Sequence, residues 1–321
     1  MRRFGLWGVL ALAAATAVAA PLKTALYVDD GCRGGGLLCW ATILRDSPDV
    51  DLKLVSGADI RSGALDDRAL VVMPGGTGRE QYAALGDAGA QKIRDFVAAG
   101  GSYFGTCCGI AIALNEETSY SKRLRMLPLK RVDGPVRGGF TANVSFNRRG
   151  AEWLGIREGD WKIRYHNGPI VEPAEPVPLG SDFEVLATMN CELMQVGEAK
   201  TPMFGTPAAV RAKYGKGQMF ALNCHPEAMP KTREIVVAGI RALTGATIRL
   251  KPMKKRAQGA ESVGFFASEL GCKSSVEEYF KLYDDPAVDV TPVTRDMLET
   301  DSALHFDRIV CPGTPKAPQA N

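Results

Sequence analysis

Short apolar runs alternate with longer amphipathic stretches along the first third of the chain. The apolar runs have the length of buried strands and lie at residues 24–28, 50–55, 69–73 and 102–105. The stretches with helical spacing lie at residues 37–44 and 88–99. Strands that alternate with helices predict an α/β fold with a doubly wound parallel sheet. Ligands of such a sheet bind beyond the carboxyl ends of its strands.

Between residues 139 and 220 the pattern changes to short β-like runs separated by turn residues. These runs lie at residues 141–146, 161–165, 183–189 and 208–212. We interpret them as antiparallel strands added to the parallel core. A helix expected at residues 231–243 closes this unit, which we predict to be one domain spanning residues 20–245.

A partial repeat of the first strand–helix–strand unit follows a basic linker at residues 246–260. Residues 264–272 resemble residues 25–32, and residues 306–313 resemble residues 67–75. Chance similarity is the alternative. We predict a repeat at residues 261–313 with three parallel strands and one helix, followed by a Pro-rich tail at residues 314–321. Three strands and one helix bury little surface on their own. We therefore expect the repeat to dock on the main domain, or on another copy of the chain, in which case the protein is a homo-oligomer.

The first residues have the pattern of a secretory signal. Two arginines precede an apolar stretch that ends in the small-x-small sequence Ala17-Val18-Ala19. The alternative is a membrane anchor, but the run is shorter than the ~20 residues that a span needs. We therefore predict a signal peptide at residues 1–19, export to the periplasm or the extracellular space, and no stable membrane anchor.

Composition and charge bear on nucleic acid as a partner and on disulfide formation. Hydrophobic residues make up 45% of the 321 positions, which is ordinary for a globular protein, and the formal net charge is +3. The linker carries the one basic cluster, so nucleic acid is not an expected partner. Eight cysteines in an exported protein favour disulfides, although their pairing cannot be deduced from spacing.

The most specific chemical pattern is Gly-Thr-Cys-Cys-Gly at residues 105–109, where a predicted strand meets a predicted helix. A nucleophile placed there would lie on a sharp elbow, with glycines on either side of it. The amino end of the next helix would favour the thiolate of Cys107. The alternative is a buried structural cysteine, which is the usual role of this residue type.

A second pattern, Asn-Cys-His-Pro-Glu at residues 223–227, ends another apolar strand. It supplies an imidazole at His225 and a carboxylate at Glu227. A core histidine is the alternative for His225. Because both patterns follow strands of one sheet, we interpret Cys107, His225 and Glu227 as nucleophile, base and orienting acid. Alternation along the strand points Cys224 away from this site.

Residues 105–109 and 225–227 resemble the elbow and the His-Pro-Glu segment of class I glutamine amidotransferases, whose sheet is flavodoxin-like. Met-Pro-Gly-Gly at residues 73–76 resembles the glycine loop that supplies their oxyanion hole. The resemblance implies that Gly75, Gly76 and the backbone of Cys108 bind the oxyanion.

Within that superfamily, the chain most resembles the domain at the amino end of biotin–protein ligases. Tyr165, His166, Asn167 and Gly168 resemble the Tyr-x-Asn-Gly segment of that group, which implies a substrate-binding loop. Two roles are open for His166, which are contact with the substrate and capping of a turn. The chain contains no Gly-Arg-Gly-Arg type loop for biotinyl adenylate, so the ligase reaction is not expected.

We therefore predict an exported hydrolase that cleaves an amide, γ-glutamyl or peptide bond of a small molecule or peptide. The alternative is a non-catalytic binding or regulatory domain with the same fold. No Cys or His spacing matches a zinc site, and neither a metal nor a cofactor is expected. The glycines at residues 34–36 lack the frame of a phosphate-binding loop, and we expect a flexible turn there.

Overall fold

The computed structural model describes most of the chain. The described residues are 20–116, 122–132, 138–175, 182–191, 203–252, 254, 257–267, 271–293 and 305–312. The expected signal peptide at residues 1–19 and the Pro-rich tail at residues 314–321 lie outside them.

A nine-stranded sheet forms the centre of the molecule, in the order β2-β1-β3-β4-β11-β10-β9-β6-β7. Its parallel strands are β1 (Leu22–Tyr27), β2 (Val50–Val55), β3 (Leu70–Met73), β4 (Ser102–Thr106) and β11 (Gly217–Leu222). This order is the flavodoxin-like arrangement. The predicted doubly wound parallel sheet is confirmed.

The other strands extend this sheet with antiparallel pairing. They are β6 (Gly139–Phe146), β7 (Gly159–His166), β9 (Glu184–Met189) and β10 (Pro207–Tyr214). A separate two-stranded sheet pairs β5 (Leu129–Arg131) with β8 (Val171–Pro173). The predicted antiparallel additions are therefore confirmed, and β7 brings the 165–168 segment back toward the parallel strands.

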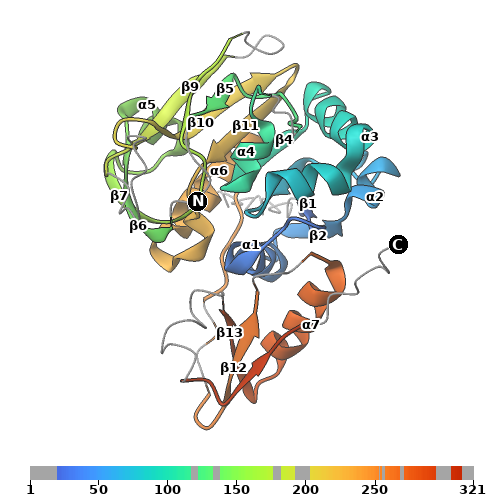
Figure 1. Ribbon diagram of the computed structural model, residues 1–321. Coiled ribbons are helices and arrows are strands. Elements are labelled where there is room, and N and C mark those ends of the chain that lie inside the picture. The colour runs from blue at the N-terminus through green and yellow to red at the C-terminus, as the bar shows by residue number, and fades with distance from the viewer. Residues whose placement is uncertain are drawn as a thin grey trace, which may run out of the picture.

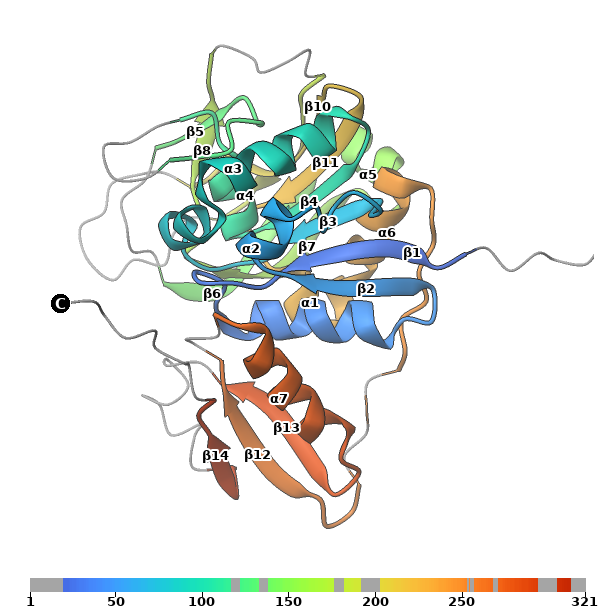
Figure 2. The ribbon, with the colours of Figure 1, turned by 90° about the vertical axis from the view of Figure 1, so that its right-hand side faces the viewer.

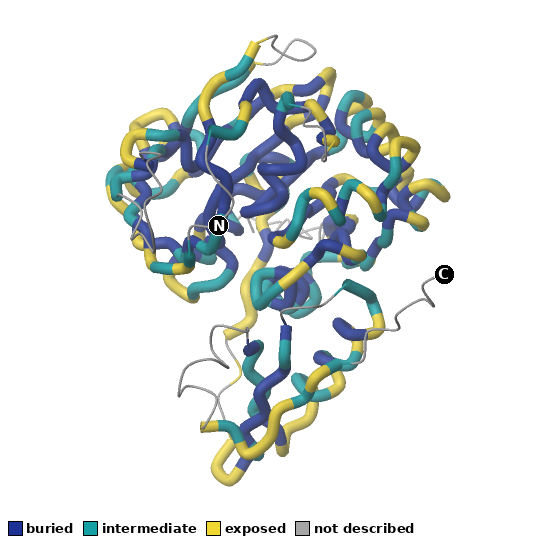
Figure 3. Tube along the Cα trace, in the orientation of Figure 1, coloured by how far each residue is buried: buried dark blue, intermediate teal, exposed yellow. Residues whose placement is uncertain are grey.

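Helices cover both faces of the sheet (Figure 2). One face carries α1 (Gly34–Asp46), α5 (Arg148–Leu154) and α6 (Arg233–Thr244), and the other carries α2 (Gly57–Arg61), α3 (Gly78–Ala98) and α4 (Cys108–Ala113). The central strands are buried between these layers (Figure 3). Trp40 of α1 packs edge-on against Phe104 of β4, and Phe104 contacts Phe220 of β11. These aromatic contacts join the helix to the strands that carry the elbow and the histidine.

Two helices begin earlier than their sequence patterns predict. The glycines at residues 34–36, expected as a flexible turn, form the first turn of α1. That turn is held because Arg33 N–H donates to the Gly75 carbonyl at 3.2 Å and Gly34 N–H to the Ala267 carbonyl at 2.7 Å. α3 begins at residue 78, ten positions before the predicted start, and Gly86 interrupts it with non-helical angles. That break divides the apolar spacing, which is why the pattern revealed only the second half.

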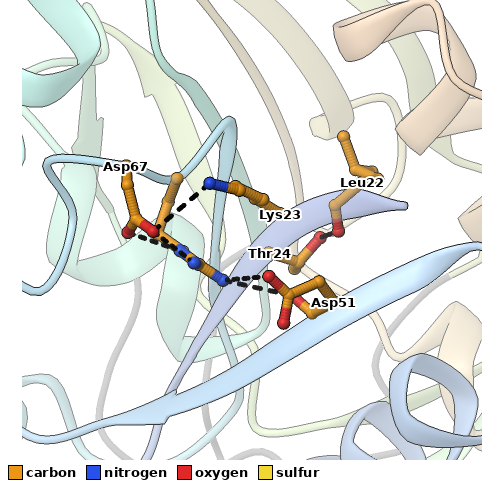
Figure 4. A network of polar contacts seen from close by, with 6 residues as sticks. Leu22, Lys23, Thr24, Asp51 and Asp67 are labelled. Carbon is orange, nitrogen blue, oxygen red and sulfur yellow. Dashed lines mark hydrogen bonds and ion pairs between the residues drawn. The ribbon is translucent and has the colours of Figure 1, made fainter. Parts of the chain in front are cut away.

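An ion-pair network joins the amino ends of the parallel strands (Figure 4). Asp67 contacts Lys23 at 3.5 Å and Arg68 at 2.6 Å, and Arg68 also contacts Asp51 of β2 at 3.2 Å. The side chain of Arg68 is nearly buried between its partners. This network fastens the end of the sheet that lies opposite the carboxyl ends of the strands, where the candidate site residues lie.

A small unit follows the main domain and repeats its first topology. Its elements are β12 (Glu261–Phe266), α7 (Lys273–Asp284), β13 (Val288–Val293) and β14 (Arg308–Val310). The strands are parallel in the order β13-β12-β14. This is the order β2-β1-β3 of the main domain, with α7 in the place of α1.

The C-terminal unit packs on α1, which therefore lies between the large sheet and the repeat (Figures 1 and 2). Arg45 pairs with Asp284 at 2.6 Å and stacks over the ring of Phe280. The Tyr283 hydroxyl donates to Asp46 at 2.8 Å. Docking on the main domain, one of the two expected arrangements, is thus present within a single chain.

All eight cysteines are free thiols, so the expectation of disulfides is wrong for this structure. The most deeply buried thiols contact oxygen atoms instead of each other. Cys32 contacts the Tyr27 carbonyl at 3.5 Å, Cys108 contacts Gln81 Oε1 at 3.3 Å, and Cys224 contacts the side chain of its neighbour. The Gln81 side chain contacts both Cys32 and Cys108, and no disulfide joins these two thiols.

Candidate active site

Cys107 lies on a strained turn between β4 and α4. Its φ of 53° and ψ of −104° are rare for a residue with a side chain. Two glycines allow the turn, because a Cβ at Gly105 would lie 2.7 Å from the Gly109 carbonyl carbon and a Cβ at Gly109 would lie 2.2 Å from the Met73 oxygen. Strand and helix can approach this closely only without those side chains. The predicted Gly-x-Cys-x-Gly elbow therefore has a steric basis.

His225 and Glu227 follow β11, the neighbour of β4 in the sheet. His225 Nδ1 lies 2.8 Å from Glu227 Oε1, and the Glu227 side chain is completely buried. Cys107 and His225 lie side by side around Gly75, close enough for each to shift the pKa of the other. The backbone N–H of His225 donates to the Arg164 carbonyl at 2.8 Å, which anchors the turn to β7. The structure thus brings all three predicted residues into one chain of contacts.

Electrostatic coupling favours the charged forms of the cysteine and histidine. Burial alone would raise the pKa of the Cys107 thiol, but the charge and hydrogen bond of His225 outweigh it, and the pKa is lowered. Burial would likewise lower the pKa of His225, but the neighbouring Cys107 and Glu227 raise it. A thiolate beside an imidazolium is the reactive form of a cysteine nucleophile.

Residues that sequence reasoning did not identify hold Glu227 in place. The Thr106 hydroxyl donates to Glu227 Oε1 at 3.3 Å, and the Trp40 indole N–H donates to the Thr106 oxygen at 2.9 Å. Gly36 lies one turn before Trp40 on α1, and a Cβ there would lie 2.9 Å from Glu227 Oε1. The one available sequence signal was the four-residue spacing of Gly36 and Trp40, which places both on one helix face.

The two glycines after β3 contact the reacting groups from the other side. The backbone of Gly76 helps to lower the pKa of the Cys107 thiol. A Cβ at Gly75 would lie 2.7 Å from His225 Cε1 and 3.4 Å from Cys107 Cβ. Cys108 is the first residue of α4, and its side chain is buried in the core. The backbone groups expected to form an oxyanion hole therefore border the nucleophile.

The predicted substrate-binding loop divides into two pairs of residues. His166 and Asn167 line the cavity beside Cys107, and the Cys107 thiol lies 3.5 Å from the His166 carbonyl. Tyr165 is buried, and its hydroxyl donates to the Gly168 carbonyl at 2.6 Å. A Cβ at Gly168 would collide with the Asn223 carbonyl. Tyr165 and Gly168 thus shape the loop instead of facing the cavity, because alternation along β7 turns Tyr165 into the core.

A cavity of about 990 Å³ lies beyond the carboxyl ends of the strands, and we call it the active-site cavity. Cys107 and His225 form part of its wall, together with residues from the start of α1 and α6. The C-terminal unit supplies another part through Tyr279, Tyr283, Asp289, Thr291 and Pro292. His305, the remaining histidine of that unit, is exposed and does not line the cavity. The repeat therefore helps to enclose the site, a role that its sequence did not reveal.

The described residues contain neither a candidate metal site nor a helix that could span a membrane. No group of three or more His, Cys, Asp or Glu side chains is placed to hold a metal ion. Within the same residues, every helix is too short or too polar to cross a membrane.

The family described as biotin-protein ligase, N terminal, matches residues 51–117. This stretch contains the glycine loop after β3 and the Cys107 elbow, so the predicted resemblance is confirmed over these residues. It ends before β11, and the turn that carries His225 lies outside the match. A comparison with curated proteins gives no match.

Several solved structures have a similar arrangement at low sequence identity. A ThuA-like protein from Bacteroides uniformis is 14% identical with a TM-score of 0.49, and the match covers 73% of this chain and 96% of that one. PurLQS from Thermotoga maritima is 14% identical with a TM-score of 0.45, covering 70% and 99%.

A β-galactosidase from Bacillus circulans sp. alkalophilus is 15% identical with a TM-score of 0.46, covering 75% of this chain. The match spans 33% of the β-galactosidase, about a third of its length. Residues 51–117 of this doubly wound α/β protein are thus similar to the biotin–protein ligase N-terminal family.

Proposed function

We propose that this protein is a hydrolase that uses Cys107 as a nucleophile to cleave an amide, γ-glutamyl or peptide bond. One observation carries the proposal. A strained cysteine borders a large cavity and contacts an imidazole, which a fully buried carboxylate holds from the other side. A purely structural cysteine has no need for this backbone strain or for a buried ionisable pair.

The proposed reaction has two steps. The Cys107 thiolate attacks the carbonyl carbon, and the N–H groups of Gly76 and Cys108 stabilise the oxyanion. The imidazolium of His225 gives its proton to the leaving amine, and the C–N bond breaks to leave a thioester on Cys107. His225 then removes a proton from water, which attacks the thioester and releases the carboxylic acid. Glu227 keeps the ring in one tautomer and stabilises its charge throughout.

Labelling with iodoacetamide tests whether Cys107 is activated. At neutral pH we expect peptide-resolved mass spectrometry to find faster carbamidomethylation at Cys107 than at Cys311, which is exposed and serves as an internal reference. Cys107→Ala is the control for peptide assignment. The same pair of proteins should then be incubated with amide, γ-glutamyl and peptide substrates, and amine release should depend on Cys107. Labelling of Cys107 no faster than that of Cys311 would contradict the proposed nucleophile.

A non-catalytic binding domain is the second candidate, and one observation favours it. Cys107 is only 6% exposed, and its sulfur lies against the His166 carbonyl. A thiol enclosed in this way could serve as part of a binding wall. Rapid labelling without any amine release, accompanied by ligand binding that survives in Cys107→Ala, would support this second function.

We also propose that the chain is exported, on the pattern of residues 1–19 and their small-x-small sequence. An exported hydrolase would meet its amide or peptide substrate outside the cytoplasm.

A further inference from the structure

The wall of the active-site cavity carries more positive than negative side chains. Its cationic members are Arg33, Arg164, Arg233, Lys251 and Lys254, and its acidic members are Asp46 and Asp289. An excess of one sign in a cleft with low-dielectric walls raises the local concentration of ligands of the opposite sign. The cavity is therefore suited to an anionic ligand.

Several of these cations have other roles. Arg33 pairs with Glu80 at 2.5 Å. Lys254 donates to the carbonyls of Tyr283 and Asp285, which fastens the linker to the C-terminal unit. Lys251 is exposed, and water screens its charge. Arg164 and Arg233 remain as partly buried cations in the wall.

Arg164 lies next to the reacting histidine. Its carbonyl accepts the backbone N–H of His225, and its side chain lies on the same face of β7 as His166. A Cβ at Gly139 would lie 2.7 Å from the Arg164 guanidinium and 2.5 Å from His166 Nδ1, so both side chains share the space left by that glycine. Among the described residues, no carboxylate forms an ion pair with Arg164.

Arg233 reaches the same turn from the opposite direction. It begins α6, and its Nε donates to the Glu227 carbonyl at 3.2 Å. In the described part of the chain it likewise forms no ion pair with a carboxylate. Two arginines are thus tied to the segment that holds His225 and Glu227. Arg164 is tied to it through its backbone carbonyl, and Arg233 through its side chain.

We propose that Arg164 and Arg233 form an anion-binding subsite. The substrate that fits such a subsite carries a carboxylate or phosphate group close to the scissile amide bond. This inference rests on the proposed function and narrows it to acidic amides. A planar guanidinium offers paired N–H donors that match the geometry of either anion. An anionic group held beside the turn would orient the carbonyl carbon toward Cys107.

Iodoacetate and iodoacetamide provide a matched test, because both alkylate Cys107 and only iodoacetate is an anion. The measured quantity is the ratio of the iodoacetate rate to the iodoacetamide rate at Cys107, divided by the same ratio at Cys311. Changes in the nucleophilicity of the thiol cancel in this ratio. In the native sequence we expect it to exceed one, since a unit charge about 4 Å away changes a rate about fivefold even in water.

The variants Arg164→Gln and Arg233→Gln should each lower the ratio, and the double variant should lower it further. Arg211→Gln is the control, because Arg211 pairs with Glu184 and does not line the cavity. Added salt should reduce the ratio in the native protein. Protection of Cys107 from iodoacetamide by glutarate but not by inorganic phosphate would identify a carboxylate, and the reverse would identify a phosphate.

The two proposals fail in different ways. Rapid labelling of Cys107 with a ratio of one, unchanged in both arginine variants, would overturn the anion subsite and leave the nucleophile in place. Slow labelling by both reagents would overturn the proposed function itself. A ratio that falls equally in Arg211→Gln would also contradict the subsite, because the effect would then come from the net charge of the protein.

Discussion

At the scale of single residues, the site combines local strain with buried charge. Cys107 has a backbone conformation that costs on the order of 1–3 kcal/mol, which neighbouring contacts must offset. Glu227 is completely buried, and its Oε1 accepts from both Thr106 and His225. The Glu227 side chain contributes to the raised pKa of His225. The reactivity of Cys107 therefore depends on the histidine more than on its own exposure.

Replacing His225 with alanine should shift the pH dependence of alkylation at Cys107. In the native protein the His225 charge lowers the pKa of the thiol below its ordinary 9.0, so the thiolate forms at lower pH. Without that charge, burial and the nearby Glu227 both favour the neutral thiol, and the pKa should rise above the native value. Each unit of pKa corresponds to about a tenfold loss of thiolate at neutral pH.

The measurement is the rate of iodoacetamide labelling at Cys107 between pH 5 and 10. His305→Ala is a suitable control, because His305 is exposed and does not line the cavity. A pH profile for His225→Ala that overlaps the native one would show that the imidazole does not activate the thiol.

At the scale of elements, the start of α1 carries more of the site than its composition suggests. Its glycines bring the helix against the turn that follows β11, so one residue of α1 borders His225 and Glu227 directly. The same helix contacts the C-terminal unit on its other side. α1 therefore couples the reaction centre to the repeat through rigid packing.

Replacing Gly36 with alanine should impair the site, whereas replacing Gly35 should not. A Cβ at Gly36 would lie 2.9 Å from Glu227 Oε1 and 3.0 Å from His225 Nδ1, which forces the pair to move. Overpacking of this kind costs about 1–3 kcal/mol of unfolding free energy. A Cβ at Gly35 would meet only Pro292 at 3.6 Å, and alanine there should be neutral or stabilise the helix by up to about 1 kcal/mol.

Chemical denaturation and the Cys107 labelling rate measure the two effects. We expect Gly36→Ala to slow labelling as well as destabilise the fold. If the two alanine variants behave alike, the close approach of α1 to the histidine turn is not present in solution.

At the scale of the whole molecule, the C-terminal unit is a partner that the chain supplies to itself. Its small sheet has the strand order of the first half-domain. It packs on α1 and borders the active-site cavity. The repeat therefore helps to enclose the cavity.

Arg45→Ala should loosen this unit without unfolding the main domain. The change removes the ion pair with Asp284 and the stacking on Phe280. Partly exposed contacts of these kinds contribute about 0.5–1 kcal/mol each. Together the two contacts amount to about 1–2 kcal/mol, so hydrogen exchange of the amides of α7 should accelerate about five- to thirtyfold, while exchange in β4 stays unchanged.

Arg148→Ala is the matched control, because Arg148 pairs with Glu152 on α5 and does not contact the repeat. Equal exchange in α7 for Arg45→Ala and the native protein would contradict the assigned docking contacts.

Export gives the last prediction at this scale. The signal pattern predicts that the protein isolated from its native host begins at Ala20 or close to it. Mass spectrometry of the amino terminus measures this directly. An intact Met1 on the protein in the cytoplasm would contradict the proposed export.

Much of the fold and the centre of the site could be read from local patterns. Apolar runs located most strands, since burial on both faces of a parallel sheet requires nearly continuous apolar sequence. Gly105, Gly109 and Cys107 identified the elbow because only glycine fits where a strand and helix approach so closely. His225 and Glu227 were identifiable because two residues of separation at a strand end keep both at one edge of the sheet.

The sequence by itself therefore determined the sheet, the elbow and the pairing of His225 with Glu227. The tertiary structure decided which other side chains reach them. Tyr165 turned into the core while Arg164 and His166 face the cavity, and Gly36 approached Glu227 from a helix nearly two hundred positions earlier in the chain. Such contacts depend on how helices and strands pack across the sheet, and packing between distant segments leaves no periodic signal in either segment alone.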